Sequence, residues 1–289
     1  MSVVNIAVCE EKGVPAILAN GRMSERSAKG YQRFATLTAP MLASISKIAA
    51  QSEADAQRFI DLGARAESVV NTGSIKFDIA LDELVQERKS QLAEQLKIQS
   101  RKVMVFASTH KGEDEQILEA VKPLLVEHKE LLAFIVPRHP ERFDAVKNLA
   151  LTAGLEVQSV SEGAAIAAST QLLVGDTMGD MLSFFGLSDI AFIGGSLIPH
   201  GGHNFLEAAA WSLPIISGPT VFNFQNIADT LVAAQALDIV ADAQELRALL
   251  ARWLEDDAAF KHKGVAAKTM LEENQGALAR LLAIIDEQL

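Results

Sequence analysis

The alternation of short apolar segments with longer segments of helical period constrains the fold of this chain more than any other feature. The apolar segments are rich in Val, Ile and Ala, and each is followed by a loop with Gly, Pro, Ser or Asn. This pattern is typical of parallel strands joined by helices that cover the sheet. We therefore predict the α/β class, with strands at residues 14–19, 47–50, 68–71, 103–107, 131–136, 171–174, 190–193 and 214–216.

A charged segment of helical character, residues 78–101, separates the first three predicted strands from the others. Such a segment is typical of a connector between domains or of a helix that flanks one. We predict a partial N-terminal domain over residues 1–90 and a second domain with C-terminal helices over residues 91–289. The first domain is expected to be incomplete because it has only about three strands.

Charge and cysteine content exclude several kinds of partner. The formal net charge of -11 disfavours binding of the whole molecule to nucleic acid or to an anionic bilayer. The single cysteine, Cys9, permits no internal disulfide, which indicates a reducing compartment such as the cytoplasm. The apolar segments are also far shorter than the roughly 20 residues that cross a bilayer.

Four glycines lie within residues 194–202, directly after the predicted strand 190–193. Glycine allows positive φ angles and lets a ligand approach the main chain, and the start of a helix favours an anion. We therefore predict a phosphate site at a helix that begins at Asn204. The alternative is a capping box in which Asn204 and Glu207 only satisfy the helix start. Both roles are compatible.

Three further loops follow predicted strands, and ligands of open α/β sheets bind at such loops. Arg138 and Arg142 lie in a loop stiffened by two prolines, where guanidinium groups suit a phosphate or a carboxylate. A helix-start turn with solvated charges is the alternative. The loops 108–113 and 175–180 offer hydroxyl and backbone donors, and each is a weak signal alone. His200 and His203 match no metal-ligand spacing, so we predict no metal site.

Basic residues recur in the predicted first domain. Arg22, Arg26, Lys29 and Arg33 are spaced by four, three and four residues, so on one helix they would share a face. Lys76 is a further cation at the end of a predicted strand. The pattern predicts a local basic patch on an acidic protein, and a merely solvated helix face is the alternative.

Short motifs along the whole chain resemble those of the 3-deoxy-D-manno-octulosonic acid (Kdo) transferases. In order, they are Arg22-Met-Ser-Glu-Arg-Ser, Thr72-Gly-Ser-Ile-Lys-Phe-Asp, Ala107-Ser-Thr-His, Pro137-Arg-His-Pro-Glu-Arg, Gly175-Asp-Thr-Met-Gly, Gly194-Gly-Ser-Leu, Gly201-Gly-His-Asn and Phe222-Asn-Phe. The resemblance implies a GT-B fold, with two Rossmann-like domains that face each other across a cleft. The N-terminal domain would then be the acceptor side, and the C-terminal one would bind a nucleotide sugar.

The implied reaction moves Kdo from its cytidine monophosphate conjugate, CMP-Kdo, to an anionic lipid A precursor during lipopolysaccharide synthesis. The family inverts the configuration of the sugar and requires no metal or other cofactor. No nucleic acid is expected as a partner. The implied location is the cytoplasmic face of the inner membrane, with membrane contact through the acceptor or through a segment upstream of this chain.

The resemblance also assigns candidate site residues. Those implied for donor binding are Ser108, Arg138, Met178, Gly195, Ser196, Asn204 and Glu207, and those implied for the acceptor or the cleft are Arg22, Ser24, Arg26 and Lys76. In similar proteins the general base lies in a segment upstream of the residues present here, so the catalytic residue is expected outside this chain. Two alternatives remain: a GT-B enzyme for another nucleotide sugar, and a non-catalytic nucleotide-binding remnant.

Overall fold

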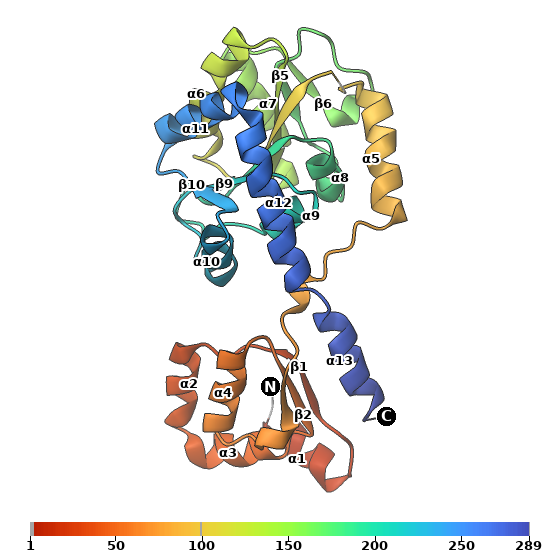
Figure 1. Cartoon of the computed structure of the whole chain (residues 1–289), viewed down its shortest axis with the longest axis vertical. Coiled ribbons are helices and arrows are strands. Elements are labelled where there is room, and N and C mark those ends of the chain that lie inside the picture. Colours follow the sequence, from red (N-terminus) through yellow and green to blue (C-terminus); the bar gives the residue numbers. More distant parts are fainter. Residues whose placement is uncertain (1–2, 99, 289) are drawn as a thin grey trace. The chain divides into compact units, whose positions relative to one another are not determined.

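The computed structural model describes residues 3–98 and 100–288, and the chain divides into two compact units (Figure 1). Unit 1 comprises Met1–Asp78 and Glu272–Leu289, and unit 2 comprises Ile79–Leu271. These limits differ from the boundary expected at residue 90. Helix α5 (Glu83–Leu96) belongs to unit 2 because it packs against α8 (Met181–Gly186).

Unit 1 is built on a parallel sheet with the strand order β1-β2-β3. The strands are β1 (Ile17–Gly21), β2 (Lys47–Ala50) and β3 (Val69–Asn71). The other elements of its first segment are α1 (Val3–Glu11), α2 (Glu25–Gln32), α3 (Ala35–Ala43), α4 (Glu53–Asp61), η1 (Ala66–Ser68) and η2 (Ile75–Phe77). Leu42, Ile45, Ile48 and Phe59 are almost fully buried and form the centre of its core.

The end of the chain returns to unit 1 as helix α13 (Ala277–Asp286), which packs against β1 and η2. The carboxylate of Asp78 accepts hydrogen bonds from the backbone N–H groups of Gly276 and Leu278, each at 2.6 Å. Leu281 and Ile284 are buried against Ala49 of β2. The C-terminal helix was expected in the second domain. It belongs to unit 1 instead, because residues of unit 1 bury its apolar face and accept the hydrogen bonds of its first turn.

Unit 2 contains a seven-stranded parallel sheet with the order β10-β9-β8-β4-β5-β7-β6. Its strands are β4 (Lys102–Thr109), β5 (Leu131–Pro137), β6 (Val157–Ser159), β7 (Leu172–Val174), β8 (Ile190–Ile193), β9 (Ile215–Ser217) and β10 (Leu237–Ile239). All residues of β5 and β8 are buried, as expected of central strands covered on both faces. This sheet and that of unit 1 confirm the predicted α/β class and every predicted strand.

Two strands were not predicted, and both lie at the edges of the larger sheet. Strands β6 and β10 have three residues each, and each contains polar and partly exposed positions. An edge strand is covered less completely than a central one, so it lacks the continuous apolar run that reveals a buried strand. The missing signal is therefore a consequence of position in the sheet.

Helices of unit 2 connect successive strands and cover the sheet (Figure 1). Besides α5 and α8 they are α6 (Asp114–Glu127), α7 (Phe143–Thr152), α9 (Leu206–Ala210), α10 (Gln225–Ala233), α11 (Ala243–Glu255) and α12 (Asp257–Glu273), with short η3 (Pro140–Arg142) and η4 (Val160–Glu162). Among the described residues, no helix combines the length and the apolar character that crossing a bilayer requires.

Candidate functional site

The loops that carry most of the sequence motifs meet at one edge of the seven-stranded sheet. Strands β4, β5, β7 and β8 are parallel and paired in register, so their carboxyl ends lie together. The loop after β4 contains His110, the loop after β5 contains Arg138, and the segment after β8 is the glycine loop, residues 194–204. In doubly wound folds this edge is where ligands bind.

The glycine loop is held by a carboxylate of the protein itself. Glu113 is fully buried, and it accepts hydrogen bonds from the backbone N–H groups of Gly195 (2.7 Å), Ser196 (3.0 Å) and Leu197 (3.0 Å). A longer bond of 3.3 Å comes from the N–H of His110. Burial raises the pKa of Glu113, and these hydrogen bonds act against that rise. The backbone N–H groups of Gly195, Ser196 and Leu197 are therefore already occupied, whereas the predicted phosphate site lies farther along, at the helix start near Asn204.

The glycine loop packs tightly against neighbouring backbone at Gly194 and at Ser196. A Cβ atom on Gly194 would lie 2.7 Å from the carbonyl oxygen of Ser108, which leaves no space for a side chain. Ser196 is also fully buried, and its hydroxyl donates to the carbonyl of Ile193 at 2.6 Å and accepts from the N–H of Gly218 at 2.8 Å. The hydroxyl of Ser196 is thus engaged within the protein.

Asn204 and Glu207 are joined, but not as a capping box. The amide nitrogen of Asn204 donates to Glu207 at 3.1 Å, and its amide oxygen accepts from the N–H of Leu206 at 3.2 Å. Helix α9 has five residues and begins at Leu206 rather than at Asn204. Burial raises the pKa of Glu207, while the bond from Asn204 and the charge of Arg138 lower it in part. Both predicted side chains thus contact each other after β8, and the charge of Arg138 acts on Glu207.

The two arginines of the loop after β5 have different roles. Arg142 forms an ion pair with the buried carboxylate of Asp114 and donates to the carbonyl of Thr109 at 3.0 Å. It therefore fixes this loop to the end of β4. Arg138 is exposed, and its backbone N–H donates to the same carbonyl at 3.0 Å. Of the two guanidinium groups, that of Arg138 is the one available to a ligand.

The turn after β7 is rigid, with one exposed side chain at its tip. Asp180 accepts from Thr177 at 2.6 Å and from Arg88 through two bonds of 2.7 Å. The hydrogen bonds from Arg88 hold the pKa of Asp180 below its ordinary value. Met178 is 68% exposed, so a ligand could reach it. Ser108, the remaining predicted donor residue, has a φ of 57°, a conformation that serine seldom adopts.

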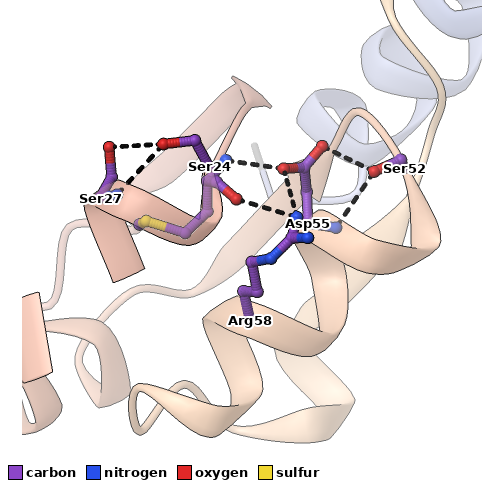
Figure 2. A network of polar contacts seen from close by, with 6 residues as sticks. Ser24, Ser27, Ser52, Asp55 and Arg58 are labelled. Atoms are coloured by element: carbon purple, nitrogen blue, oxygen red, sulfur yellow. Dashed lines mark hydrogen bonds and ion pairs between the residues drawn. The ribbon is translucent and has the colours of Figure 1, made fainter. Parts of the chain in front are cut away.

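In unit 1, a buried carboxylate fixes the predicted acceptor loop (Figure 2). Asp55 accepts from the N–H of Met23 at 2.8 Å and from the hydroxyl of Ser52 at 2.7 Å. Arg58 lies 3.6 Å from this carboxylate and donates to the carbonyl of Met23 at 3.1 Å. Both backbone polar groups of Met23 are therefore held, midway between the predicted residues Arg22 and Ser24.

The basic residues of unit 1 do not all lie on one helix. Ser24 caps α2, because its hydroxyl accepts from the N–H of Ser27 at 3.1 Å, so Arg22 precedes the helix. Arg26 and Lys29 lie within α2, and Lys29 forms an exposed pair with Glu25 at 2.6 Å. The predicted single basic face is thus divided between the helix and the loop before it.

A cavity of about 470 Å³ lies in unit 1 beside these basic residues. Apolar side chains dominate its lining, and those of Tyr31, Phe34 and Leu37 are exposed. Arg22 contributes a guanidinium group to the same cavity. The remaining predicted acceptor residue, Lys76, lies in η2. Unit 1 therefore combines an apolar cavity with positive charge.

Three functional residues were not identified as such from the sequence: Glu113, Asp55 and His110. Glu113 and Asp55 each hold a loop that lies far away along the chain. His110 forms a contact of 2.7 Å between its Nε2 atom and that of His203. The motif around Ser108 includes His110 and Glu113, but its spacing carries no information about the loop that they contact.

Comparison with known proteins agrees with these motifs. Residues 4–79 match the family model described as 3-Deoxy-D-manno-octulosonic-acid transferase (kdotransferase). The 3-deoxy-D-manno-octulosonic acid transferase of Haemophilus influenzae is 39% identical over 95% of this chain and 64% of its own length. The 3-deoxy-D-manno-octulosonic acid transferase of Bordetella pertussis is 31% identical over 98% of this chain and 66% of its own length. The chain thus spans slightly less than two thirds of the curated relatives that it matches.

Solved structures extend the likeness to the fold. The C-terminal CMP-Kdo binding domain of WaaA from Acinetobacter baumannii is 37% identical, with a TM-score of 0.63, over 66% of this chain and 99% of that domain. A UDP-GlcNAc 2-epimerase from Neisseria meningitidis covers 96% of this chain at 12% identity and a TM-score of 0.61, and it shares the fold alone. The predicted GT-B type, built from Rossmann-like domains, is confirmed. By its motifs, its relatives and the fold of its larger unit, the chain belongs to the Kdo transferase family.

Proposed function

We propose that unit 2 binds CMP-Kdo and that the protein of which these units are part transfers Kdo to a lipid A precursor, with inversion and without a metal. The observation that carries this proposal is the sheet edge where Arg138 and Glu207 lie close together beside a rigid glycine loop. A guanidinium group suits the phosphate of the donor, and a carboxylate suits the hydroxyl groups of the ribose. The A. baumannii neighbour, which binds CMP-Kdo, supports this assignment.

The donor residues then fall into two groups. Arg138, Met178, Asn204 and Glu207 would contact the nucleotide through their side chains. Ser108, Gly195 and Ser196 would shape the floor of the site, since the Ser196 hydroxyl is engaged within the protein and Ser108 approaches Gly194 closely. A preorganised site of this kind stabilises charge on a departing phosphate without rearrangement.

Unit 1 would contact the acceptor. Its apolar cavity and the adjacent Arg22, Ser24 and Arg26 suit an amphiphile that carries anionic groups, as a lipid A precursor does. Lys76 would supply a further positive charge. The proposed location of the complete protein is the cytoplasmic face of the inner membrane, where such an acceptor is reached at the membrane surface.

Calorimetric titration with cytidine monophosphate tests the donor site, with uridine monophosphate as the comparison. We expect cytidine-selective binding that Glu207→Ala weakens about 10- to 100-fold, the usual value of a hydrogen bond to a charged group. Glu127→Ala is the matched control, because Glu127 is exposed at the end of α6. Equal binding of both nucleotides would favour an enzyme for another nucleotide sugar, and absence of binding by the folded chain would refute the donor site.

Co-sedimentation with vesicles tests the acceptor side. The chain should bind vesicles that contain anionic phospholipid more tightly than neutral vesicles, and Arg22→Gln should reduce this difference severalfold. Arg252→Gln, at an exposed position of α11, should leave it unchanged. If Arg22→Gln binds as the unaltered chain does, Arg22 does not contact the acceptor.

A further inference from the structure

Histidines from three loops meet at the donor edge of unit 2. His110 follows β4 and is buried, whereas His200 and His203 belong to the glycine loop. The ring of His200 lies over that of His110, with 3.9 Å between the ring centroids. His139, from the loop after β5, meets His110 edge to face at 5.5 Å. The donor contacts proposed above use none of these four rings.

His110 and His203 are arranged end to end. Their Nε2 atoms are 2.7 Å apart, the ring centroids are 5.0 Å apart, and the ring planes differ by 2°. This is the geometry of a hydrogen bond in which one Nε2 carries the proton and the other accepts it. The bond requires that only one of the two facing Nε2 atoms carries a proton, because two protonated Nε2 atoms could not face each other.

A shared metal ion fits this arrangement less well. The ligand nitrogens of His110, His200 and His203 all lie within 4.8 Å of one another. However, two imidazoles on one zinc ion, each at about 2.0–2.1 Å, need nitrogens more than about 3 Å apart in a tetrahedral site. His200 also stacks on His110 instead of pointing with it toward a common centre. The cluster is therefore better described as a hydrogen-bonded pair with a stacked third ring.

Positive groups surround the pair from three loops. Burial, followed by the charges of His200, His139, Arg142 and Arg138, lowers the pKa of His110 to about 4. Burial, His110, Arg138, His200 and His139 lower the pKa of His203 to about 4 as well. Both rings are thus neutral at physiological pH, in agreement with the hydrogen bond between them.

The neighbouring carboxylates are engaged elsewhere. Glu113 accepts from backbone amides of the glycine loop, Asp114 pairs with Arg142, and Glu207 accepts from Asn204. Lys111, next to His110, is exposed and adds positive charge. The surroundings of the histidine pair therefore favour a bound anion, which would offset the positive charge that now opposes protonation.

We propose that His110 and His203, together with Arg138, form an oxyanion subsite that takes up one proton from solvent when its anion binds. The inference rests on the proposed donor site, because the anion would be the phosphate or the carboxylate of that donor. The proton adds to the Nε2 atom that accepts in the free pair, and this breaks the bond between the two Nε2 atoms, since both then carry hydrogen. One imidazolium N–H is released to donate to the anion, and no covalent bond changes.

Proton uptake is measured by titrating the chain with cytidine monophosphate in buffers that differ in ionisation enthalpy, near pH 7.5. We expect uptake of up to about one proton per bound nucleotide and tighter binding by at most about tenfold per unit fall in pH. Cytidine alone carries no anion and should bind without uptake. Proton uptake with cytidine monophosphate would identify the bound anion as the phosphate. Proton uptake only with cytidine plus free Kdo would identify the bound anion as the carboxylate.

Nitrogen-15 spectra of the imidazole rings provide a second readout that phosphate titration does not affect. In the free chain, one Nε2 of the pair should be protonated and the other not, and both should be protonated in the complex. The double variant His110→Gln and His203→Gln should abolish proton uptake, because neither glutamine titrates. His262→Gln, at an exposed position of α12, is the control and should retain the uptake.

The outcomes separate the two proposals. Nucleotide binding with the pair neutral throughout, or with uptake unchanged in the double glutamine variant, would overturn the subsite and leave the donor site intact. Failure of the folded chain to bind any of these ligands would refute the donor site, and the subsite with it. Because the spectra are recorded on the unaltered chain, the subsite remains testable if a variant does not fold.

Discussion

Each unit uses one buried carboxylate to hold the loop that we assign to ligand binding, but the two carboxylates have different donors. Glu113 in unit 2 accepts only from backbone N–H groups, three of which belong to the glycine loop. Asp55 in unit 1 accepts from one backbone N–H and one hydroxyl, with a guanidinium group 3.6 Å away. The glycine loop of unit 2 is held through its backbone N–H groups alone. The loop at Met23 of unit 1 is held partly through the side chains of Ser52 and Arg58, which also contact Asp55 or Met23.

This difference determines how each site responds to change. Backbone N–H groups cannot turn away or become acceptors, so any loss at Glu113 leaves buried donors without partners. The hydroxyl of Ser52 can rotate and accept instead, and Arg58 can move toward solvent. The comparison indicates a rigid loop in unit 2 and a more adaptable loop in unit 1, as would suit the proposed nucleotide-sugar donor and lipid acceptor.

Replacing Glu113 by glutamine should have the largest effect. The new amide group would face backbone donors that need an acceptor, so we expect the free energy of unfolding of unit 2 to fall by about 2–4 kcal/mol. Denaturant unfolding measures this, and faster amide exchange at Gly195–Leu197 would localise it. Glu119→Gln, at an exposed position of α6, should have little effect. Equal losses in the two variants would contradict the role of Glu113.

Asp55→Asn should lower the free energy of unfolding of unit 1 by less, about 1–2 kcal/mol, although the same carboxylate-to-amide change is made. Asparagine can still accept from Met23, and its amide can donate to the Ser52 hydroxyl, so mainly the interaction with Arg58 is lost. Amide exchange at Met23 should accelerate in this variant, while Asp61→Asn at the end of α4 serves as the control. A cost that exceeds that of Glu113→Gln would reverse the comparison.

The histidine pair predicts a pH dependence confined to unit 2. His203 has a folded pKa lowered to about 4, so the unfolded chain binds more protons between that value and its ordinary pKa of 6.5. Stability should therefore fall as the pH falls through this range. In His203→Gln the loss between pH 7 and pH 5 should be smaller by about 2 kcal/mol. An unchanged loss, compared with His262→Gln, would show that His203 is not held neutral.

The smallest effect is expected where a pair of side chains is partly exposed. Arg88 and Asp180 join α5 to the turn before α8 through two bonds, but 40% of the Arg88 side chain is exposed. A double-mutant cycle of Arg88→Met and Asp180→Asn should give a coupling of about 0.5–1 kcal/mol. Coupling well above about 1 kcal/mol would show that solvent exposure is not what limits the pair.

Local patterns predicted more of the fold than of the site. Central strands such as β5 and β8 are apolar throughout, so periodicity and loop chemistry identified them. The role of Glu113 depends on a loop 82 residues farther along the chain, and that of Asp55 on a residue 32 positions before it. No local spacing encodes such contacts. The same reason explains why the sequence did not reveal that the Ser196 hydroxyl bonds to Ile193 and Gly218.

The hydrogen bonds of Asp78 have a consequence for the order of folding. Asp78 and Gly276 are 198 residues apart in sequence, and all of unit 2 lies between them. Unit 2 can complete its contacts as soon as its own residues have left the ribosome. Unit 1 has to wait for the last helix of this chain and then close a long loop, which slows folding. Until α13 docks, the apolar surface around Ala49 is exposed to chaperones and proteases, so removal of α13 should impair unit 1 and spare unit 2.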